Sequence, residues 1–294
     1  MRAFDLAREW PASSTSICVI DRQGETHSFG DTSRASRIAS VSKLLTAWAT
    51  HVAVEEGSTS LDAPVGQQNC TLAHLLAHAG GYSFDGAVPI VAVKRKRIYS
   101  NTGYDLITQH IADLTGIEFS EYLKDAIFAP LGMNKSFLNG SGASAVVSCV
   151  DDLVEFALEL RNPSLISVAT ANAATTTQFA ELEGVVPGVG RFDPCNWGLG
   201  PEIHGSKHPH WMGSRNSAST FGHCGGSGSF IWHDPAANVS CVGLCEVEFD
   251  AWALHHWPIF FDAVLDEFIF DARFRGAGLA LGVATPNKPD RFHV

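Results

Sequence analysis

The sequence predicts a discontinuous α/β lobe, in which an antiparallel sheet is flanked by helices, together with an inserted all-helical lobe. Three observations predict this architecture. Apolar residues alternate as in strands near the N-terminus and again after about residue 190, they recur at helical spacing in between, and a last helix-like segment follows the final strands. We therefore expect residues 1–58 and 192–294 to form the α/β lobe and residues 59–191 the helical lobe.

The N-terminal and middle elements are predicted from periodicity and from their stop signals. Residues 16–29 alternate loosely and turn at Arg22-Gln23-Gly24, which is typical of a β-hairpin. Thr71 is expected to cap one helix, and Ser148 with Asp151 to form a capping box at another. Apolar spacing and terminal Gly, Asn or Pro residues predict helices over 41–57, 71–79, 103–115, 120–128, 148–162 and 164–180.

The C-terminal third of the chain has a different pattern. Segments 197–200, 227–233 and 238–246 are expected to be strands. Residues 251–270 are apolar and aromatic at helical spacing, which predicts a helix. The segment 201–222 is polar and rich in Ser and His, so we expect a long surface loop there.

The composition excludes several classes of protein. Of the 294 residues, 45 % are hydrophobic and 17 % are charged, as in soluble globular enzymes. The net charge of −11 would repel phosphate backbones, so no nucleic-acid partner is expected. No apolar run approaches the roughly 18 residues that span a bilayer. The N-terminus does not read as a secretory signal, and seven irregularly spaced cysteines suit reduced thiols, so a cytoplasmic location is expected.

Ser40 stands three residues before Lys43, at the start of a predicted helix. Residues three apart share a helix face, so the lysine can act as a base that activates the serine hydroxyl if burial lowers its pKa. The helix N-terminus would favour a developing anion. The alternative is a helix cap beside a solvated lysine. This S-x-x-K is the only one in the chain, and its lysine sits in an apolar stretch where an idle charge is costly, which favours the nucleophile.

Two further motifs offer polar groups. Tyr99-Ser100-Asn101 is the only Y-x-N in the chain; its phenol can relay a proton and its amide can bind a carbonyl, although Asn101 can instead cap the following helix. His223-Cys224-Gly225-Gly226 precedes a predicted strand, and its glycines let a backbone N–H approach a ligand closely. The similar His78-Ala79-Gly80-Gly81 ends a helix, so His78 is expected to be structural.

In this order, Ser40-x-x-Lys43, Tyr99-Ser100-Asn101 and His223-Cys224-Gly225 resemble the three motifs of the class C β-lactamase-like serine hydrolases. That family includes penicillin-binding proteins, D-amino-acid peptidases and carboxylesterases. The segments TLAHLLAHAGGY, EYLKDAIFAPLGMNKSF and SCVDDLVEFALEL are also similar to segments of the family. The resemblance runs from about residue 36 to about residue 248, and it implies a β-lactamase/transpeptidase-like fold with the active site at the lobe interface.

The resemblance implies a role for each matched residue. Ser40 would be the acylated nucleophile, Lys43 its base, and Tyr99 a partner in proton transfer. The backbone N–H groups of Ser40 and Gly226 would form the oxyanion hole. No metal or cofactor is implied. The substrate-binding side of the site would comprise Asn101, His223, Cys224 and Gly225.

Departures from the family motifs affect the expected substrate. His223 stands where many relatives carry lysine, which would make the charge of the site depend on pH near neutrality and would disfavour β-lactams. Cys224 replaces a small hydroxyl residue. We therefore expect a serine hydrolase that acts through an acyl-enzyme on a small ester or amide, with an ester favoured. The alternatives are a D-stereospecific peptidase or amidase, a weak β-lactamase, and a catalytically silent binding relative.

Several other residues have plainer interpretations. The run Lys94-Arg95-Lys96-Arg97 can steer acidic substrates, but a solvated edge is favoured. His74 and His78 have a spacing that can bind zinc, yet no carboxylate base lies between them, so a metal is not expected. The histidines of 201–222 are expected to be solvated. Cys224 is expected to be the thiol that reacts most readily with alkylating agents.

Overall fold

A six-stranded antiparallel sheet is the main feature of the computed structural model, which describes residues 1–278. The sheet has the strand order β2-β1-β12-β11-β10-β9, so strands from both ends of the chain pair with one another, for example Val19 with Cys241. The predicted hairpin at 16–29 is confirmed. The strands are β1 (Thr15–Ile20), β2 (Thr26–Phe29), β9 (Glu202–Ile203), β10 (Phe221–Gly225), β11 (Ser229–Asp234) and β12 (Val239–Cys245).

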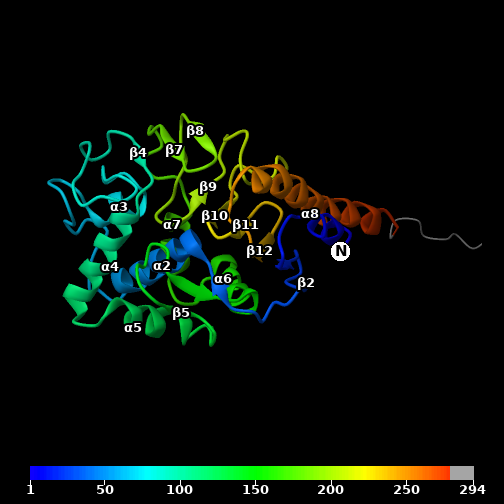
Figure 1. Cartoon of the computed structure of the whole chain (residues 1–294), viewed down its shortest axis with the longest axis horizontal. Helices are drawn as coiled ribbons and strands as arrows, with labels where there is room; N and C mark the ends of the chain where they lie inside the picture. The colour runs from blue at the N-terminus through cyan, green and yellow to red at the C-terminus, as the bar shows by residue number, and fades with distance from the viewer. Residues whose placement is uncertain (279–294) are drawn as a thin grey trace, which may run out of the picture.

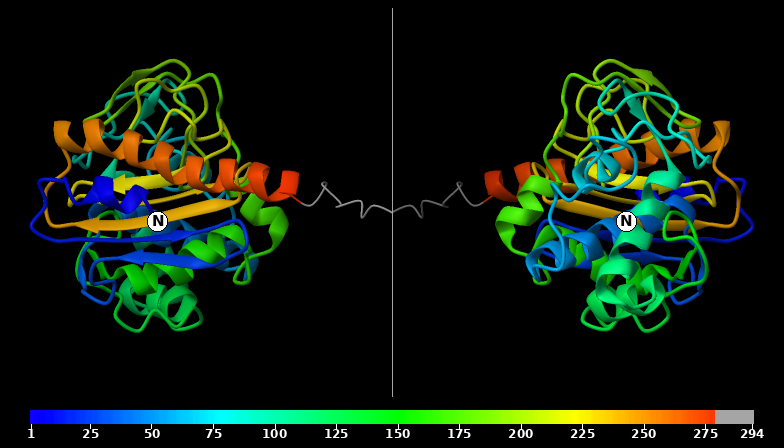
Figure 2. Two further views of the ribbon diagram at one scale, coloured as in Figure 1. Left: turned by 90° about the vertical axis from the view of Figure 1, so that its right-hand side faces the viewer. Right: turned by 90° about the vertical axis from the view of Figure 1, so that its left-hand side faces the viewer.

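Helices cover both faces of this sheet. Because side chains alternate along a strand, Phe230 joins the apolar cluster on one face and Ile231 the cluster on the other. The first face packs against α1 (Ala3–Ala7) and α8 (Ala251–Gly278), and α8 lies over the sheet roughly along the direction of its strands (Figures 1 and 2). The ring centroids of Phe230 and Trp257 lie 4.9 Å apart at this contact.

The opposite face carries α6 (Val150–Arg161), and α2 (Ser42–Glu55) adjoins the same apolar core. The other helices are α3 (Leu72–Leu76), α4 (Asn101–Thr115), α5 (Phe119–Leu123) with its π-helical continuation η2 (Lys124–Phe128), and α7 (Val168–Ala174). Two small sheets complete the fold: β3 (Ser36–Arg37), β6 (Val146–Ser148) and β5 (Phe137–Leu138), and β4 (Arg97–Ile98), β7 (Gly184–Val186) and β8 (Gly190–Phe192).

The predicted helices are present, but one predicted cap is wrong. Helix α6 begins at Val150 with Cys149 as its N-cap residue, so Ser148 and Asp151 form no capping box. Ser148 instead ends β6, and its hydroxyl hydrogen-bonds to that of Ser136 at 2.7 Å. A serine hydroxyl can bond to several kinds of partner, and here the residue that precedes β5 supplies the partner instead of the helix.

The segment from 197 to 222 differs most from its prediction. Residues 197–200 form no strand, and Trp197 makes only an isolated bridge with Glu202. The expected surface loop at 201–222 is wrong as well, because it contains β9 and buries many of its polar side chains around Glu202. One of them, His210, hydrogen-bonds to the Glu202 carboxylate at 2.9 Å. Polar groups can be buried when they pair with one another, because each group then has a partner that replaces water.

The antiparallel sheet with helices on both faces confirms the predicted α/β fold. The division into lobes at 1–58, 59–191 and 192–294 stays a prediction. Residues 279–294 of the last range lie outside the described residues.

Candidate active site

Ser40 lies in a short 3-10 turn, η1 (Ala39–Val41), that leads from β3 into α2. The preceding residue, Ala39, has a φ of 44°, which is unfavourable for a residue with a Cβ atom and is the kind of strain found at functional sites. Val41 is the N-cap residue of α2, and no side chain caps that helix. The alternative interpretation of Ser40 as a helix cap is therefore wrong, and its hydroxyl is left for another use.

Lys43 is fully buried on the first turn of α2, where its Nζ lies 3.5 Å from Ser40 Oγ. The same Nζ donates hydrogen bonds to Asn101 Oδ1 at 2.6 Å and to the Ala143 carbonyl at 2.8 Å. Burial lowers the pKa of Lys43 from 10.5 to about 7, against the opposing charge of Asp105. A neutral amine is therefore available next to Ser40 near neutral pH.

Asn101 is the first residue of α4 and is oriented from both ends of its amide. Its Oδ1 accepts from Lys43, and its Nδ2 donates to Asp85 Oδ1 at 3.1 Å. The N-cap of α4 is Ser100, whose hydroxyl accepts from the Gly103 N–H at 3.0 Å, so Asn101 is not needed as a cap.

Tyr99 and His223 meet between β4 and β10. The Tyr99 hydroxyl lies 3.3 Å from His223 Nε2, and His223 Nδ1 lies 2.6 Å from the Cys224 carbonyl. Since a carbonyl can only accept, Nδ1 carries the proton and Nε2 accepts from Tyr99. Burial raises the pKa of Tyr99 well above 10, with the Ser40 hydroxyl opposing this, so the phenol stays protonated.

His223 does not behave as its sequence position suggests. Burial, followed by the charge of Lys43, lowers the pKa of His223 from 6.5 to about 4. The expectation that its charge changes near neutral pH is therefore wrong, because the imidazole is neutral across that range. The third motif thus places a neutral hydrogen-bond acceptor, rather than a cation, behind the Tyr99 hydroxyl.

Gly225 brings β10 against the nucleophile turn. A Cβ atom at this position would lie 2.5 Å from the Ile38 carbonyl oxygen and 3.2 Å from Ser40 N, so only glycine allows this approach. Gly226 follows at the end of β10. The oxyanion hole formed by the Ser40 and Gly226 N–H groups stays a prediction.

Cys224 is half-buried, whereas the other six cysteines are buried, and all seven are free thiols. Burial raises the pKa of Cys224 well above 9, which keeps it as the less reactive thiol form. The partial exposure of Cys224 favours alkylation, whereas its raised pKa disfavours it. The expected preferential alkylation of Cys224 stays a prediction.

Three groups outside the motifs shape the site, and sequence reasoning missed the first two. Asp85 orients Asn101, and the Ala143 carbonyl holds Lys43. The third is His78, which packs against the Tyr99 ring at 4.5 Å between centroids and accepts the Ser100 N–H at Nδ1. These contacts agree with the structural role expected of His78, and they place it directly behind the motif. A main-chain carbonyl such as that of Ala143 leaves no signal in a sequence.

Two of the basic and histidine residues considered from the sequence, Arg97 and His74, have structural partners. Arg97, expected at a solvated edge, is buried and donates to the carbonyls of Cys195 and Ala77, among others. His74 Nδ1 accepts from the Thr71 N–H at 3.0 Å, which completes the predicted cap of α3. The Nδ1 atom of His74 is therefore already used in a hydrogen bond.

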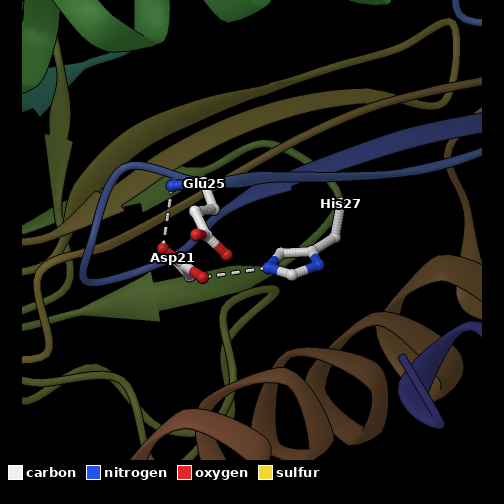
Figure 3. Close-up of side chains that lie close together, drawn as sticks. All are labelled: Asp21, Glu25 and His27. Atoms are coloured by element: carbon white, nitrogen blue, oxygen red, sulfur yellow. Dashed lines mark hydrogen bonds and ion pairs between the residues drawn. The ribbon is translucent and has the colours of Figure 1, made fainter.

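Asp21, Glu25 and His27 bring three potential ligand atoms within 4.8 Å at the turn between β1 and β2 (Figure 3). The Asp21 carboxylate already accepts the N–H groups of Gln23 and Glu25 at 2.9 Å, and it lies 2.9 Å from His27 Nε2. These hydrogen bonds stabilise the turn of the hairpin, which explains why the three side chains lie close together.

The chain matches the family model described as Beta-lactamase over residues 21–252, and it therefore belongs to the β-lactamase family. The match includes all three motifs, which confirms the resemblance and the β-lactamase/transpeptidase-like fold. A comparison with curated proteins gives no match.

Three solved structures illustrate the relationship. A β-lactamase from Mycobacterium bovis is 42 % identical with a TM-score of 0.89, covering 90 % of this chain and 99 % of that one. A mutant of simvastatin synthase from Aspergillus terreus is 16 % identical (TM-score 0.71; 90 % and 93 % covered). A D-stereospecific amidohydrolase from a Streptomyces species is 18 % identical (TM-score 0.67; 87 % and 96 % covered), and these last two likenesses concern the fold alone. Within residues 1–278, no helix has the length and apolar character needed to cross a membrane.

Proposed function

We propose that this protein is a serine hydrolase that cleaves a small uncharged ester through an acyl-enzyme on Ser40. The observation that carries the proposal is the fully buried Lys43, whose Nζ lies 3.5 Å from Ser40 Oγ and whose pKa is lowered to about 7. Burying a lysine without a carboxylate partner costs free energy. A role as a general base explains this cost, because a general base works best when its pKa lies near the operating pH. The distance is long for a hydrogen bond, as in many enzymes before substrate binds.

The contacts of Lys43 support its role as the base. A neutral amine has two N–H groups and one lone pair. The two N–H groups are used by Asn101 Oδ1 and the Ala143 carbonyl, which leaves the lone pair for the Ser40 hydroxyl. As Ser40 Oγ forms its bond to the substrate carbonyl carbon, Lys43 takes the hydroxyl proton.

Tyr99 would complete the proton transfer. The developing oxyanion would be stabilised by the N–H groups of Ser40 and Gly226. When the bond to the leaving group breaks, a proton held by Lys43 would reach the leaving oxygen by way of the Tyr99 hydroxyl, which His223 orients. Water then attacks the acyl-enzyme by the same route in reverse, releasing the acid and restoring the Ser40 hydroxyl.

The neutral state of His223 favours an uncharged substrate. A lysine at this position would attract a carboxylate, whereas a histidine whose pKa is lowered to about 4 carries no charge near pH 7. This supports an ester over a β-lactam or a peptide with a free carboxylate. A catalytically silent relative is disfavoured because it would gain nothing from the buried Lys43.

A labelling experiment tests the acyl-enzyme. We expect a fluorophosphonate probe to add its mass to Ser40 in the wild-type protein and in the Ser33→Ala variant, which changes an exposed serine, but not in Ser40→Ala. Tryptic mass spectrometry locates the adduct, and hydrolysis of p-nitrophenyl acetate measures turnover. An unlabelled wild-type protein that leaves the ester intact would refute the proposal.

A D-stereospecific amidase or peptidase is the second candidate. Lys96 is exposed and lines a cavity that also contains Tyr99, so it could bind a substrate carboxylate. Comparing D-Ala peptides and a chromogenic cephalosporin with the ester separates these activities. A higher kcat/KM for the peptide or the cephalosporin would replace the ester proposal.

A further inference from the structure

We propose that the cavity beside Tyr99 binds an apolar group of the substrate, so that the enzyme prefers hydrophobic esters to short ones. This inference rests on the proposed esterase function and names its substrate class. The cavity holds about 420 Å³, which is within the range of small-molecule sites. Its apolar walls include Phe84, Ile90, Ile98, Tyr99, Val185 and Pro187.

The apolar side chains at this cavity are unusually open to solvent. Phe84, Ile90 and Val185 have exposed fractions of 46 %, 58 % and 56 %. Single exposed apolar residues are ordinary on a protein surface, but these three converge on one cavity from the 81–98 segment and from β7. A ligand that covered them would remove apolar surface from water on both sides of the contact.

Tyr99 connects the cavity with the candidate active site, because it belongs to both. Tyr99 lines the cavity and also contacts His223, while the Phe84 and Tyr99 rings stack with centroids 5.9 Å apart. The Phe84 carbonyl accepts the Asn101 N–H at 2.8 Å. A backbone hydrogen bond therefore links a lining residue of the cavity to a residue of the candidate active site. Ser40 does not line the cavity. A substrate whose carbonyl lies at Ser40 would therefore extend its non-reacting group past Tyr99 into this space.

The charges around the cavity favour an apolar occupant over an anionic one. Arg97 is buried and its guanidinium is used by backbone carbonyls. Arg191, which also lines the cavity, is paired with Glu183. Lys96 is the remaining basic residue of the lining, and it is exposed, where a single charge contributes little to affinity.

An ester series tests the preference. We expect kcat/KM for p-nitrophenyl esters to rise about fourfold per methylene from acetate to octanoate, since each buried CH₂ adds a constant increment. A second series, with a fixed acetyl group and lengthening alcohols, shows whether the acyl or the alcohol side enters the cavity. A rise in either series supports the inference. Flat or falling profiles in both, with Ser40 still labelled by the fluorophosphonate, overturn the inference but leave the proposed function standing.

Binding without turnover provides an independent test. Calorimetric titration with acetamide, hexanamide and octanamide should show affinity that increases with chain length in the wild-type protein. If octanamide binds but no ester is cleaved, the subsite stands and the esterase proposal fails. If octanamide binds no better than acetamide, the subsite is wrong whatever the ester assays show. Tighter binding of a D-Ala dipeptide than of octanamide would assign the cavity to a carboxylate-bearing substrate and would also overturn the inference.

Variants locate the effect. Val185→Ser and Ile90→Ser should each reduce the octanoate-to-acetate ratio of kcat/KM about fivefold or more, and using the ratio removes general losses of activity. Val168→Ser is the matched control, because this valine is 62 % exposed on α7 and does not line the cavity. The inference fails if the cavity variants keep the wild-type ratio, or if Val168→Ser lowers it as much as they do.

Discussion

Lys43 is the residue on which the chemistry depends, because its protonation decides whether Ser40 has a base. In the protonated form all three hydrogens of Nζ would be donors, and the lone pair that must take the Ser40 proton would be lost. Burial makes this form costly enough to lower the pKa of Lys43 to about 7. His223, whose pKa is lowered to about 4, is already neutral there. The two residues can therefore be distinguished by their pH dependence.

We predict that kcat/KM for p-nitrophenyl acetate rises with pH, with an apparent pKa of about 7, and levels off above it. Below that pKa the protonated fraction of Lys43 grows, so the rate should fall about tenfold per pH unit. His223→Gln should lower the rate but keep this dependence. Lys43→Arg should lose at least about a hundredfold at every pH, because arginine stays protonated. A profile that is flat from pH 5.5 to 8, or a dependence that disappears in His223→Gln, would contradict the assignment.

At the scale of elements, the site depends on how closely β10 approaches the η1 turn. Gly225 sits at this contact, and a Cβ atom there would lie 2.3 Å from Ser229 Oγ and 2.5 Å from the Ile38 carbonyl oxygen. Ser229 in turn donates to that same carbonyl at 2.6 Å. This hydrogen bond ties the start of β11 to the residue before the η1 turn, and only a glycine at position 225 of β10 leaves room for it.

We predict that Gly225→Ala lowers kcat about a hundredfold and destabilises the fold by about 1–3 kcal/mol. The added methyl group forces β10 away from Ser40, and a displacement of about 1 Å is enough for such a loss of rate. Gly190→Ala is the control, since the nearest atom to its added Cβ is 3.6 Å away. Steady-state kinetics and thermal unfolding measure the two effects. Wild-type kcat in Gly225→Ala would show that the contact does not position the nucleophile.

The elements that were predictable from sequence are those with a local signal. The hairpin and α2 follow from periodicity and stop residues, and the three motifs follow from their order along the chain. The contact of Asn101 with Lys43 spans 58 positions and had no local signal, although the resemblance placed both in one site. The prediction for 201–222 is wrong because a polar composition favours exposure to solvent only when the polar groups have no partners, and here Lys207 and Glu202 are buried and paired.

At the scale of the whole molecule, the segment 201–222 contributes a buried charged cluster at the edge of the main sheet. Lys207 Nζ lies 3.1 Å from Glu202 Oε1, with side-chain exposures of 0 % and 2 %. His210 and Trp211 also bind the Glu202 carboxylate, at 2.9 and 2.8 Å. Burial alone would raise the pKa of Glu202, but Lys207 and His210 hold it well below its usual range. The carboxylate therefore stays ionised and ties β9 to the following loop.

We predict that Glu202→Gln lowers the free energy of unfolding by about 3–5 kcal/mol at pH 7, because it leaves the buried Lys207 charge with backbone carbonyls but no carboxylate to balance it. Combining it with Lys207→Met should cost less than the two single changes added together. Because the pKa of Glu202 is lowered in the folded state, its contribution to stability is present above the unfolded value of 4.5 and is lost as the pH falls below that value. The difference in stability between Glu202→Gln and the wild-type protein should therefore shrink at low pH. Denaturant unfolding measures each variant, with Glu121→Gln in the exposed pair to Lys124 as a control expected within about 0.5 kcal/mol of wild type. Additive losses in the double variant would show that the two charges do not stabilise each other.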